Sequence, residues 1–261
     1  MFPVILKVGP LTIYSYGTMM AIAFLVAGFL TAKELQRKNL DPDVASTLVV
    51  WAAIGGVAFS KLWSVAEDVP GLLRDPVHAI FSGSGFVWYG GLLGGTLAIS
   101  WVVRRHKLPW LQVVDSAAPG LALGHAIGRI GCQLAGDGDW GAISEVPWAM
   151  AYPDAIIGWP FPPGVRVHPT PVYETLAYVA VFAILWSIRK RPLPPGTIFW
   201  WYLVLGPGAR FLIEFVRINR PVVFSLTAPQ LVSLALVAIG AWQLWQGRHQ
   251  PVRAAPVARK S

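Results

Sequence analysis

Two arginine-bearing segments hold the residues best suited to chemistry. The first runs over residues 128–141 (GRIGCQLAGDGDWG) and carries Arg129 among five glycines. A guanidinium group is planar and can donate two parallel hydrogen bonds to phosphate oxygens. Glycines let backbone N–H groups approach a ligand closely, and so many of them predict that this run is not a stable helix. The segment therefore favours binding of an anionic phosphate group.

The same run has two other interpretations. A glycine-rich helix end whose arginine pairs with Asp137 or Asp139 would require no ligand. An Asp-Gly-Asp sequence also suits calcium, but the later ligands and the glutamate of an EF-hand are missing here. The sequence leaves the ion-pair interpretation open, and we expect no metal site.

The second segment ends an apolar run and contains Arg210, Glu214 and Arg217. On a helix, these three side chains would share one face. Gly206-Pro207-Gly208 precedes them and predicts a break or kink, which would open a cavity in which polar groups are solvated. An ion pair that lets Arg210 enter a bilayer explains Glu214, but it leaves Arg217 as a surplus positive charge.

A third segment, His168-Pro169-Thr170-Pro171-Val172-Tyr173-Glu174, is typical of a helix start. Thr170 can cap the helix, Pro171 suits the first helical position, and Glu174 complements the helix dipole. This local explanation accounts for most of the segment, so His168 is a weaker functional candidate.

Long apolar runs must position these segments. The chain has 261 residues, of which 55% are hydrophobic and 13% charged, whereas soluble domains carry about 25% charged residues. Its 13 tryptophans fit the two interfaces of a bilayer. Runs of about 20 residues, long enough to cross a bilayer, lie near 14–32, 44–63, 86–103, 110–127, 171–188, 197–215 and 225–246. We therefore predict an all-α membrane protein, a polytopic bundle of about seven transmembrane helices.

The basic residues predict the orientation of this bundle. The formal net charge is +8, but the charges lie between apolar runs, which argues against a nucleic-acid surface. Cytoplasmic loops retain Lys and Arg, and 13 of the 21 lie at 33–38, 104–107, 189–191 and in the tail. This places the N-terminus outside and the C-terminus in the cytoplasm. We expect one transmembrane domain over residues 1–249, an outer-side loop near 128–170, and a disordered basic cytoplasmic tail over 250–261.

Taken together, these segments resemble the phosphatidylglycerol–prolipoprotein diacylglyceryl transferase family. Five short motifs carry the resemblance in order along nearly the whole chain: Ser15-Tyr16-Gly17, Gly90-Gly91, Gly-Arg-Ile-Gly at 128–131, His-Pro…Tyr-Glu at 168–174 and Arg…Glu…Arg at 210–217. The resemblance implies a multi-pass enzyme of the bacterial cytoplasmic (inner) membrane. It would transfer diacylglycerol from phosphatidylglycerol to the lipobox cysteine thiol of a prolipoprotein, the first step of lipoprotein maturation, without a cofactor.

The resemblance also implies roles for particular residues. Arg129 and Arg210 would bind the donor phosphate and stabilise the charge that develops on it, and Glu214 would orient Arg210. Tyr16 would line the lipid site. The other implied site residues are Gly131, Asp137 and Gly141 as lipid-binding positions, and Tyr89, His168, Tyr173, Glu174 and Arg217 as further candidates.

The sequence departs from the family pattern at several positions. Tyr89 replaces a histidine before the Gly-Gly pair, Cys132 replaces an asparagine, and Ala135 and Asp137 stand at later Asn and Glu positions. The identity of the base therefore stays open. Two alternatives also stay open: a divergent family member that uses another donor or acceptor, and a noncatalytic membrane protein that binds anionic lipids.

Overall fold

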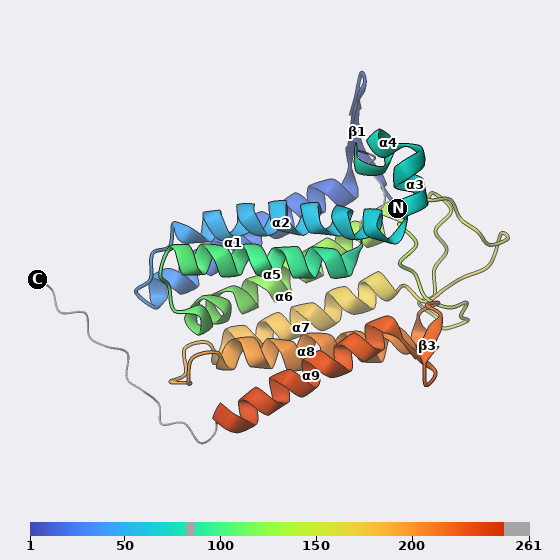
Figure 1. Ribbon diagram of the computed structural model, residues 1–261. Helices are drawn as coiled ribbons and strands as arrows, with labels where there is room; N and C mark the ends of the chain where they lie inside the picture. Colours follow the sequence, from blue (N-terminus) through green and yellow to red (C-terminus); the bar gives the residue numbers. More distant parts are fainter. Residues whose placement is uncertain (82–86, 248–261) are drawn as a thin grey trace, which may run out of the picture. The chain divides into compact units, whose positions relative to one another are not determined.

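The computed structural model (Figure 1) describes residues 1–81 and 87–247, and it is mainly helical. A long helix occupies each predicted apolar run: α1 (Ser15–Arg37), α2 (Val44–Glu67), α5 (Trp88–Arg105), α6 (Trp110–Ala135), α7 (Thr170–Ile188), α8 (Thr197–Ile213) and α9 (Ala228–Gly247). The shorter elements are α3 (Val69–Arg74), α4 (Pro76–Phe81), the 3-10 turn η1 (Glu214–Val216), and the antiparallel hairpins of β1 (Val4–Val8) with β2 (Leu11–Tyr14) and of β3 (Pro221–Val223) with β4 (Leu226–Thr227). The tail predicted over 250–261 lies outside the described residues.

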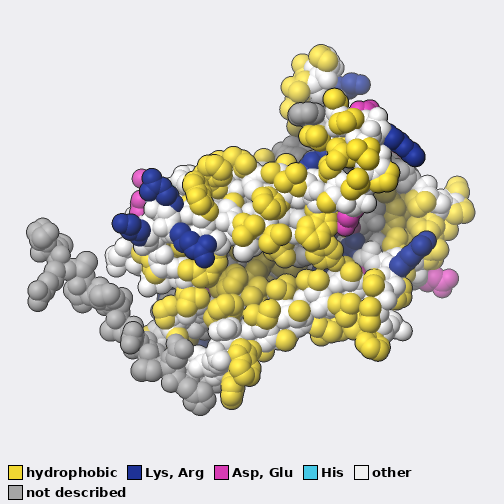
Figure 2. All heavy atoms as spheres, in the orientation of Figure 1, with side chains coloured by type: hydrophobic (Ala, Val, Ile, Leu, Met, Phe, Trp, Pro, Cys, Tyr) yellow, Lys and Arg dark blue, Asp and Glu magenta, His cyan; other side chains and the backbone are white. Residues whose placement is uncertain are grey.

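Four of these helices, α1, α2, α7 and α9, are long and apolar enough to cross a membrane. By contrast, α8 has 17 residues, and α5 and α6 are diluted by glycines and polar residues. Apolar side chains cover much of the visible surface of the helices (Figure 2). Exposed apolar residues include Ile54 and Val57 of α2 and Trp242 and Trp245 of α9. Lipid is a better solvent than water for such surfaces. The prediction of a helical multi-pass membrane protein is confirmed, and the number of spans and their orientation stay predictions.

The chain divides into two compact units, one formed by Met1–Leu30 and the chain from Val114 onward, the other by Thr31–Val113. Both α1 and α6 pass from one unit into the other. In the second unit, α2 and α5 pack side by side (Figure 1). A Cβ atom on Gly55 would lie 2.7 Å from the carbonyl oxygen of Gly94. Glycines therefore let these two helices approach backbone to backbone.

In the first unit, α8 packs against both α7 and α9 (Figure 1). A buried carboxylate of α6 also fixes where α8 begins. The Oδ2 atom of Asp115 accepts a hydrogen bond from the backbone N–H of Gly196 at 2.7 Å, and its Oδ1 atom accepts one from Phe199 at 2.9 Å. The first turn of a helix has free N–H groups, which an acceptor can satisfy. Asp115 therefore joins α6 to the start of α8.

The helix α6 continues to Ala135, so the prediction of a non-helical run over 128–141 is wrong for its first eight residues. The loop that follows, called the outer loop here after its predicted side of the membrane, accordingly begins at Gly136, where φ is +63° and the backbone N–H donates to the carbonyl oxygen of Cys132. Glycine is tolerated in this helix because α1 lies close to it. A Cβ atom on Gly131 would be 3.0 Å from the Cβ atom of Met19. Close packing therefore outweighs the low helix propensity of glycine.

The predicted break in α8 does not occur, because the helix continues through Pro207 to Ile213. Gly206, just before the proline, packs closely on the ring of Tyr178, since a Cβ atom on this glycine would lie 3.2 Å from Cε1 of the ring. Such tertiary packing can hold a proline within a membrane helix. After η1 the backbone of Arg217 is extended, so Arg210 and Arg217 do not share one helix face.

The start of α7 also differs from the prediction. Thr170 is the first residue of the helix and its side chain makes no capping hydrogen bond. Its hydroxyl instead donates a hydrogen bond to the backbone carbonyl of Asp139. Thr170 therefore fastens the outer loop to α7 rather than capping the helix.

Candidate functional site

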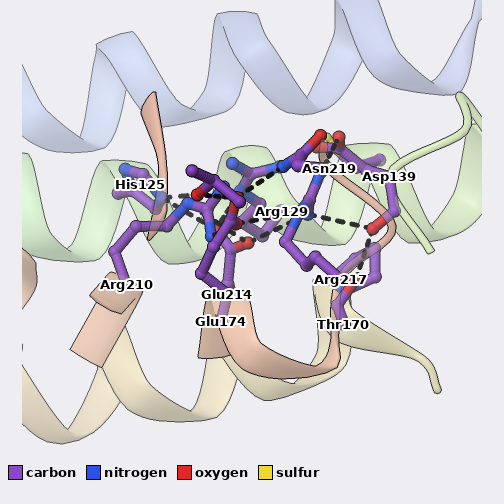
Figure 3. A network of polar contacts seen from close by, with 12 residues as sticks. His125, Arg129, Asp139, Thr170, Glu174, Arg210, Glu214, Arg217 and Asn219 are labelled. Atoms are coloured by element: carbon purple, nitrogen blue, oxygen red, sulfur yellow. Dashed lines mark hydrogen bonds and ion pairs between the residues drawn. The ribbon is translucent and has the colours of Figure 1, made fainter. Parts of the chain in front are cut away.

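Glu174 is the centre of a polar cluster in the first unit (Figure 3), and its side chain has no exposed surface. Its Oε2 atom lies 2.6 Å from Nε of Arg129. Its Oε1 atom lies 3.2 Å from Nη1 of Arg217 and 3.9 Å from Nε of Arg210. A buried carboxylate is stable only when it is paired and hydrogen-bonded. Glu174 on α7 thus gathers arginines from α6, from α8 and from the segment after η1.

Glu214 is a second buried carboxylate of the cluster. It pairs with Arg210, and its Oε2 atom lies 3.6 Å from Nε of Arg217. Its Oε1 atom accepts hydrogen bonds from Nδ2 of Asn219 and from the hydroxyl of Thr227, both at 2.7 Å. These contacts hold Glu214 in place, so it can fix the orientation of Arg210.

Asp139, in the outer loop, supplies a third carboxylate. It pairs with Arg129, and its Oδ1 atom lies 2.5 Å from Nη2 of Arg217. Its backbone oxygen accepts a further hydrogen bond from Nη1 of Arg217 at 3.0 Å. Burial alone would raise the pKa of this carboxyl group, but the guanidinium groups of Arg129 and Arg217 lower the pKa below its ordinary value. Asp139 is therefore ionised at neutral pH and binds the outer loop to the cluster.

The formal charges of this arginine cluster cancel. We define it as Arg129, Arg210 and Arg217 with Asp139, Glu174 and Glu214. Arg217 is therefore not the surplus positive charge predicted from the sequence, because Asp139 and Glu174 compensate it. These partners lie 78 and 43 residues from Arg217 along the chain. Only the folded structure brings them together.

The three arginines differ in how many of their nitrogens are occupied. Arg217 is 8% exposed and uses both terminal nitrogens in contacts with Asp139 and Glu174. The side chains of Arg129 and Arg210 are 18% and 16% exposed. In the part of the chain that the structure describes, no residue forms a hydrogen bond with Nη2 of Arg129 or Arg210. These two nitrogens can donate to a ligand.

The predicted lipid-site glycines have structural reasons to be glycine. Gly131 faces α1, where a Cβ atom would lie 3.4 Å from the Cα atom of Tyr16. Tyr16 itself is in the first turn of α1, and 42% of it is exposed. At Gly141 a Cβ atom would lie 2.8 Å from Cγ2 of Thr170 and 2.9 Å from Cβ of His168. The structure thus places Tyr16 and Gly131 together, and it packs Gly141 against the start of α7.

Asp137 lies beside the cluster in the outer loop. Its Oδ1 atom accepts a hydrogen bond from the backbone N–H of Asp139 at 3.3 Å, and burial raises the pKa of its carboxyl group. Ligand atoms of Cys132, Asp137 and Asp139 lie within 4.8 Å of one another, a spacing that a metal ion could bridge. Arg129 and Arg217 already bind Asp139, however, and their positive charges oppose a cation there. The arrangement does not favour a metal ion.

The side chains of His168 and Tyr173 make no hydrogen bond to the arginine cluster among the described residues. The Nδ1 atom of His168 is 3.0 Å from the hydroxyl of Tyr173, which accepts a hydrogen bond from Nε1 of Trp148 at 2.6 Å. These three side chains join the outer loop to α7. Tyr89 is in the first turn of α5, which belongs to the other compact unit.

One member of the site was missed by the sequence analysis. His125 on α6 has its Nε2 atom 3.5 Å from Oε2 of Glu174 and also 3.5 Å from Nε of Arg129. Its spacing of four residues before Arg129 puts both on one helix face, and an ionisable residue within an apolar run is a functional candidate. That signal was present in the sequence.

The fold and the site together define a class of protein: a multi-pass helical membrane protein with a buried cluster of arginines and carboxylates. A sequence model of one family, prolipoprotein diacylglyceryl transferase, matches residues 3–246. The chain belongs to this family, and the resemblance seen in its motifs is confirmed.

Similar proteins carry the same name. A protein from Gloeobacter violaceus, named phosphatidylglycerol--prolipoprotein diacylglyceryl transferase, is 35% identical over 253 residues, covering 93% of this chain and 91% of its own. Proteins of that name from Chromohalobacter salexigens and Clostridium tetani are 32% and 30% identical. The match with the Chromohalobacter protein covers 96% of this chain and 94% of that protein. The match with the Clostridium protein covers 92% of this chain and 95% of that protein. The similarity therefore extends over the whole site and not over one motif.

Proposed function

We propose that this chain transfers the diacylglyceryl group of phosphatidylglycerol to the lipobox cysteine thiol of prolipoproteins, the first step of bacterial lipoprotein maturation. The observation that carries the proposal is that Nη2 of Arg129 and Nη2 of Arg210 have no hydrogen bond to any described residue, although both arginines belong to a buried cluster of ion pairs. The names of the similar proteins support the same donor and acceptor. Both arginines are then ligands of the donor phosphate.

The chemistry requires such ligands. The phosphodiester of phosphatidylglycerol carries one negative charge, and more charge develops on the phosphate as its bond to the diacylglyceryl carbon breaks. Fixed guanidinium donors stabilise that charge without reorganisation. Glu174 holds Arg129 through Nε, and Glu214 holds Arg210 through Nη1. The carboxylates thus orient the arginines, and the incoming thiolate displaces glycerol phosphate.

The lipid itself is proposed to lie along the residues around Arg129. Tyr16 is exposed next to Gly131, and Asp137 is in the loop that follows. These three positions are proposed to line the donor site, and Gly141 to allow the loop to close against α7. Tyr173 and His168 are proposed to shape the outer loop rather than contact the phosphate.

The proposed location is the bacterial cytoplasmic membrane, with seven spans and the N-terminus outside. The distribution of Lys and Arg supports this orientation, since 13 of the 21 lie in one alternating set of connections and in the tail. The arginine cluster then faces the outer leaflet, where a secreted prolipoprotein presents its lipobox.

The test is transfer by purified protein in detergent micelles that contain phosphatidylglycerol and a synthetic lipobox peptide. Release of glycerol phosphate and lipidation of the peptide are both measured. Arg129→Lys and Arg210→Lys keep the charge but lose the planar fork, so each should lower turnover by about 100-fold or more. Arg166→Lys, at an exposed position in the outer loop, is the matched control.

Folding is checked for every variant by size-exclusion chromatography and thermal unfolding. If folded Lys variants keep near-normal transfer, the arginines serve the ion-pair network and not the phosphate. If the wild-type protein binds phosphatidylglycerol but releases no glycerol phosphate with the peptide, it is a lipid-binding protein and the proposed reaction is wrong.

A further inference from the structure

His125 is the member of the site for which the mechanism above has no role. It lies on α6 one helical turn before Arg129, and its Nε2 atom is 3.5 Å from Oε2 of Glu174 (Figure 3). Its ring stacks on the ring of Tyr178, with 3.7 Å between the centroids and 16° between the planes. The side chain is still 28% exposed. His125 is thus held in one orientation at an accessible position.

The described contacts of the ring involve one of its two nitrogens. Nε2 lies 3.5 Å from Oε2 of Glu174, and Nε of Arg129 lies 3.5 Å from the same ring nitrogen and 2.6 Å from Glu174. An ionised carboxylate can only accept hydrogen bonds, so the tautomer that pairs with Glu174 carries its proton on Nε2. In that tautomer Nδ1, which has no hydrogen-bond partner among the described residues, keeps a free lone pair.

The groups around the ring suit reversible proton transfer. Arg129 from α6 and Arg210 from α8 place positive charge near the ring, and Tyr178 of α7 covers one of its faces. Glu174 stabilises the imidazolium that forms once a proton has been taken. An imidazole backed by a carboxylate is a general base of this kind.

Other nearby groups are less suited to the task. Glu174, Glu214 and Asp139 each contact two or more guanidinium groups, so their carboxylate oxygens are already engaged. His168 has its Nδ1 atom engaged with the hydroxyl of Tyr173. Among the described residues of the first unit, His125 is the imidazole that combines a carboxylate partner with a free nitrogen.

We propose that His125 is the proton acceptor of the transfer reaction, with Glu174 as its positioning residue, a proposal that rests on the proposed function. Nδ1 takes the proton of the lipobox thiol. The thiolate sulfur then forms a C–S bond to the diacylglyceryl carbon, the C–O bond to the phosphate breaks, and its electron pair leaves with glycerol phosphate. The proton on His125 passes to the departing phosphate, which returns the ring to the neutral form.

The experiment compares acceptor peptides that contain cysteine or selenocysteine, kept reduced, in micelles containing phosphatidylglycerol. A selenol is ionised at neutral pH and needs no base. His125→Gln should lower transfer to the cysteine peptide by about 100-fold at neutral pH, with recovery as the pH rises and the thiol ionises unaided. Transfer to the selenocysteine peptide should stay close to the wild-type rate. His106→Gln, at an exposed position after α5, is the control.

A second measurement needs no variant and therefore does not depend on folding. With wild-type protein, the rate for the cysteine peptide should fall as the pH is lowered through the ionisation of the base. The rate for the selenocysteine peptide should not fall over that range.

Three results would overturn the assignment. With wild-type protein, the transfer rates for both peptides could fall equally as the pH is lowered. Folded His125→Gln could lose transfer to both peptides equally, or His168→Gln rather than His125→Gln could abolish the fall in rate at low pH. Absence of transfer to either peptide by folded wild-type protein refutes the proposed function itself, so the two failures are distinguishable.

Discussion

Among individual residues, the three arginines of the cluster have separate tasks. Arg217 contacts the side chain and the backbone of Asp139 and also Glu174, so it joins the outer loop to α7. Arg129 and Arg210 each have one terminal nitrogen without a hydrogen bond to a described residue, which we propose binds the donor phosphate. Substitution by lysine should therefore have different effects at these positions.

Arg217→Lys is expected to destabilise the protein more than it impairs binding of the donor. Lysine keeps the charge but cannot reach Asp139 and Glu174 with separate nitrogens of one rigid group. Losing hydrogen bonds between charged groups should lower the free energy of unfolding by about 2 kcal/mol. The thermal unfolding midpoint in detergent measures this loss. An unchanged midpoint together with lost turnover would instead assign Arg217 to the substrate.

Cys132 is a buried thiol close to the site, with Sγ 3.8 Å from Nη1 of Arg129. In the proposed reaction the substrate supplies the reacting thiol. Since serine is similar in size, Cys132→Ser should keep more than about half of the turnover. Mass spectrometry of the wild-type protein during turnover is the complementary measurement. A lipid adduct on Cys132 that is required for turnover would favour a ping-pong mechanism instead.

Part of this site could be predicted from the sequence. Arg129, Arg210 and Glu214 stand out because charge near membrane depth is costly and therefore informative. Glu174 was only a further candidate, because helix-start preferences already explained a glutamate after Thr-Pro. Its position at the centre of the cluster depends on α6, α7 and α8 converging. That convergence is a tertiary property and leaves no local pattern.

Among the helices and loops, the join between α6 and α8 depends on one buried carboxylate. Asp115→Ala would remove both acceptors at the start of α8 and leave the N–H groups of Gly196 and Phe199 without this partner. The expected cost is about 2 kcal/mol of unfolding free energy, measured as a lower thermal midpoint. Asp154→Ala, at an exposed loop position, is the control. Equal midpoints would show that water replaces the carboxylate.

The helix positions followed from hydropathy, because each apolar run long enough to span a bilayer formed a helix. The helix ends, and the glycines and prolines inside helices, could not be placed correctly from hydropathy. Gly131 and Pro207 predicted irregular backbone, yet both lie inside helices that pack closely on neighbours. Intrinsic preference is a weak guide wherever close packing of two helices favours a residue without a side chain.

For the whole molecule, the orientation in the membrane can be tested with a reporter that is active only outside the cytoplasm. Fused after Arg191 it should be silent, because that connection carries three consecutive basic residues. Fused near Asp154, in the outer loop, it should be active. A reporter that is active only in the cytoplasm should give the opposite pattern and serves as the control. Reversed results from both reporters would place the arginine cluster at the inner leaflet.

The cancelling charges of the arginine cluster bear on the end of the catalytic cycle. Three guanidinium groups facing three carboxylates provide directed hydrogen bonds without an excess of positive charge. Phosphatidylglycerol enters with one negative charge. The product, glycerol phosphate, is a phosphate monoester, which carries about 1.5 to 2 negative charges at neutral pH. A strongly cationic pocket would hold that product more tightly than the donor. An electroneutral site instead favours release of glycerol phosphate, so product inhibition is expected to be weak.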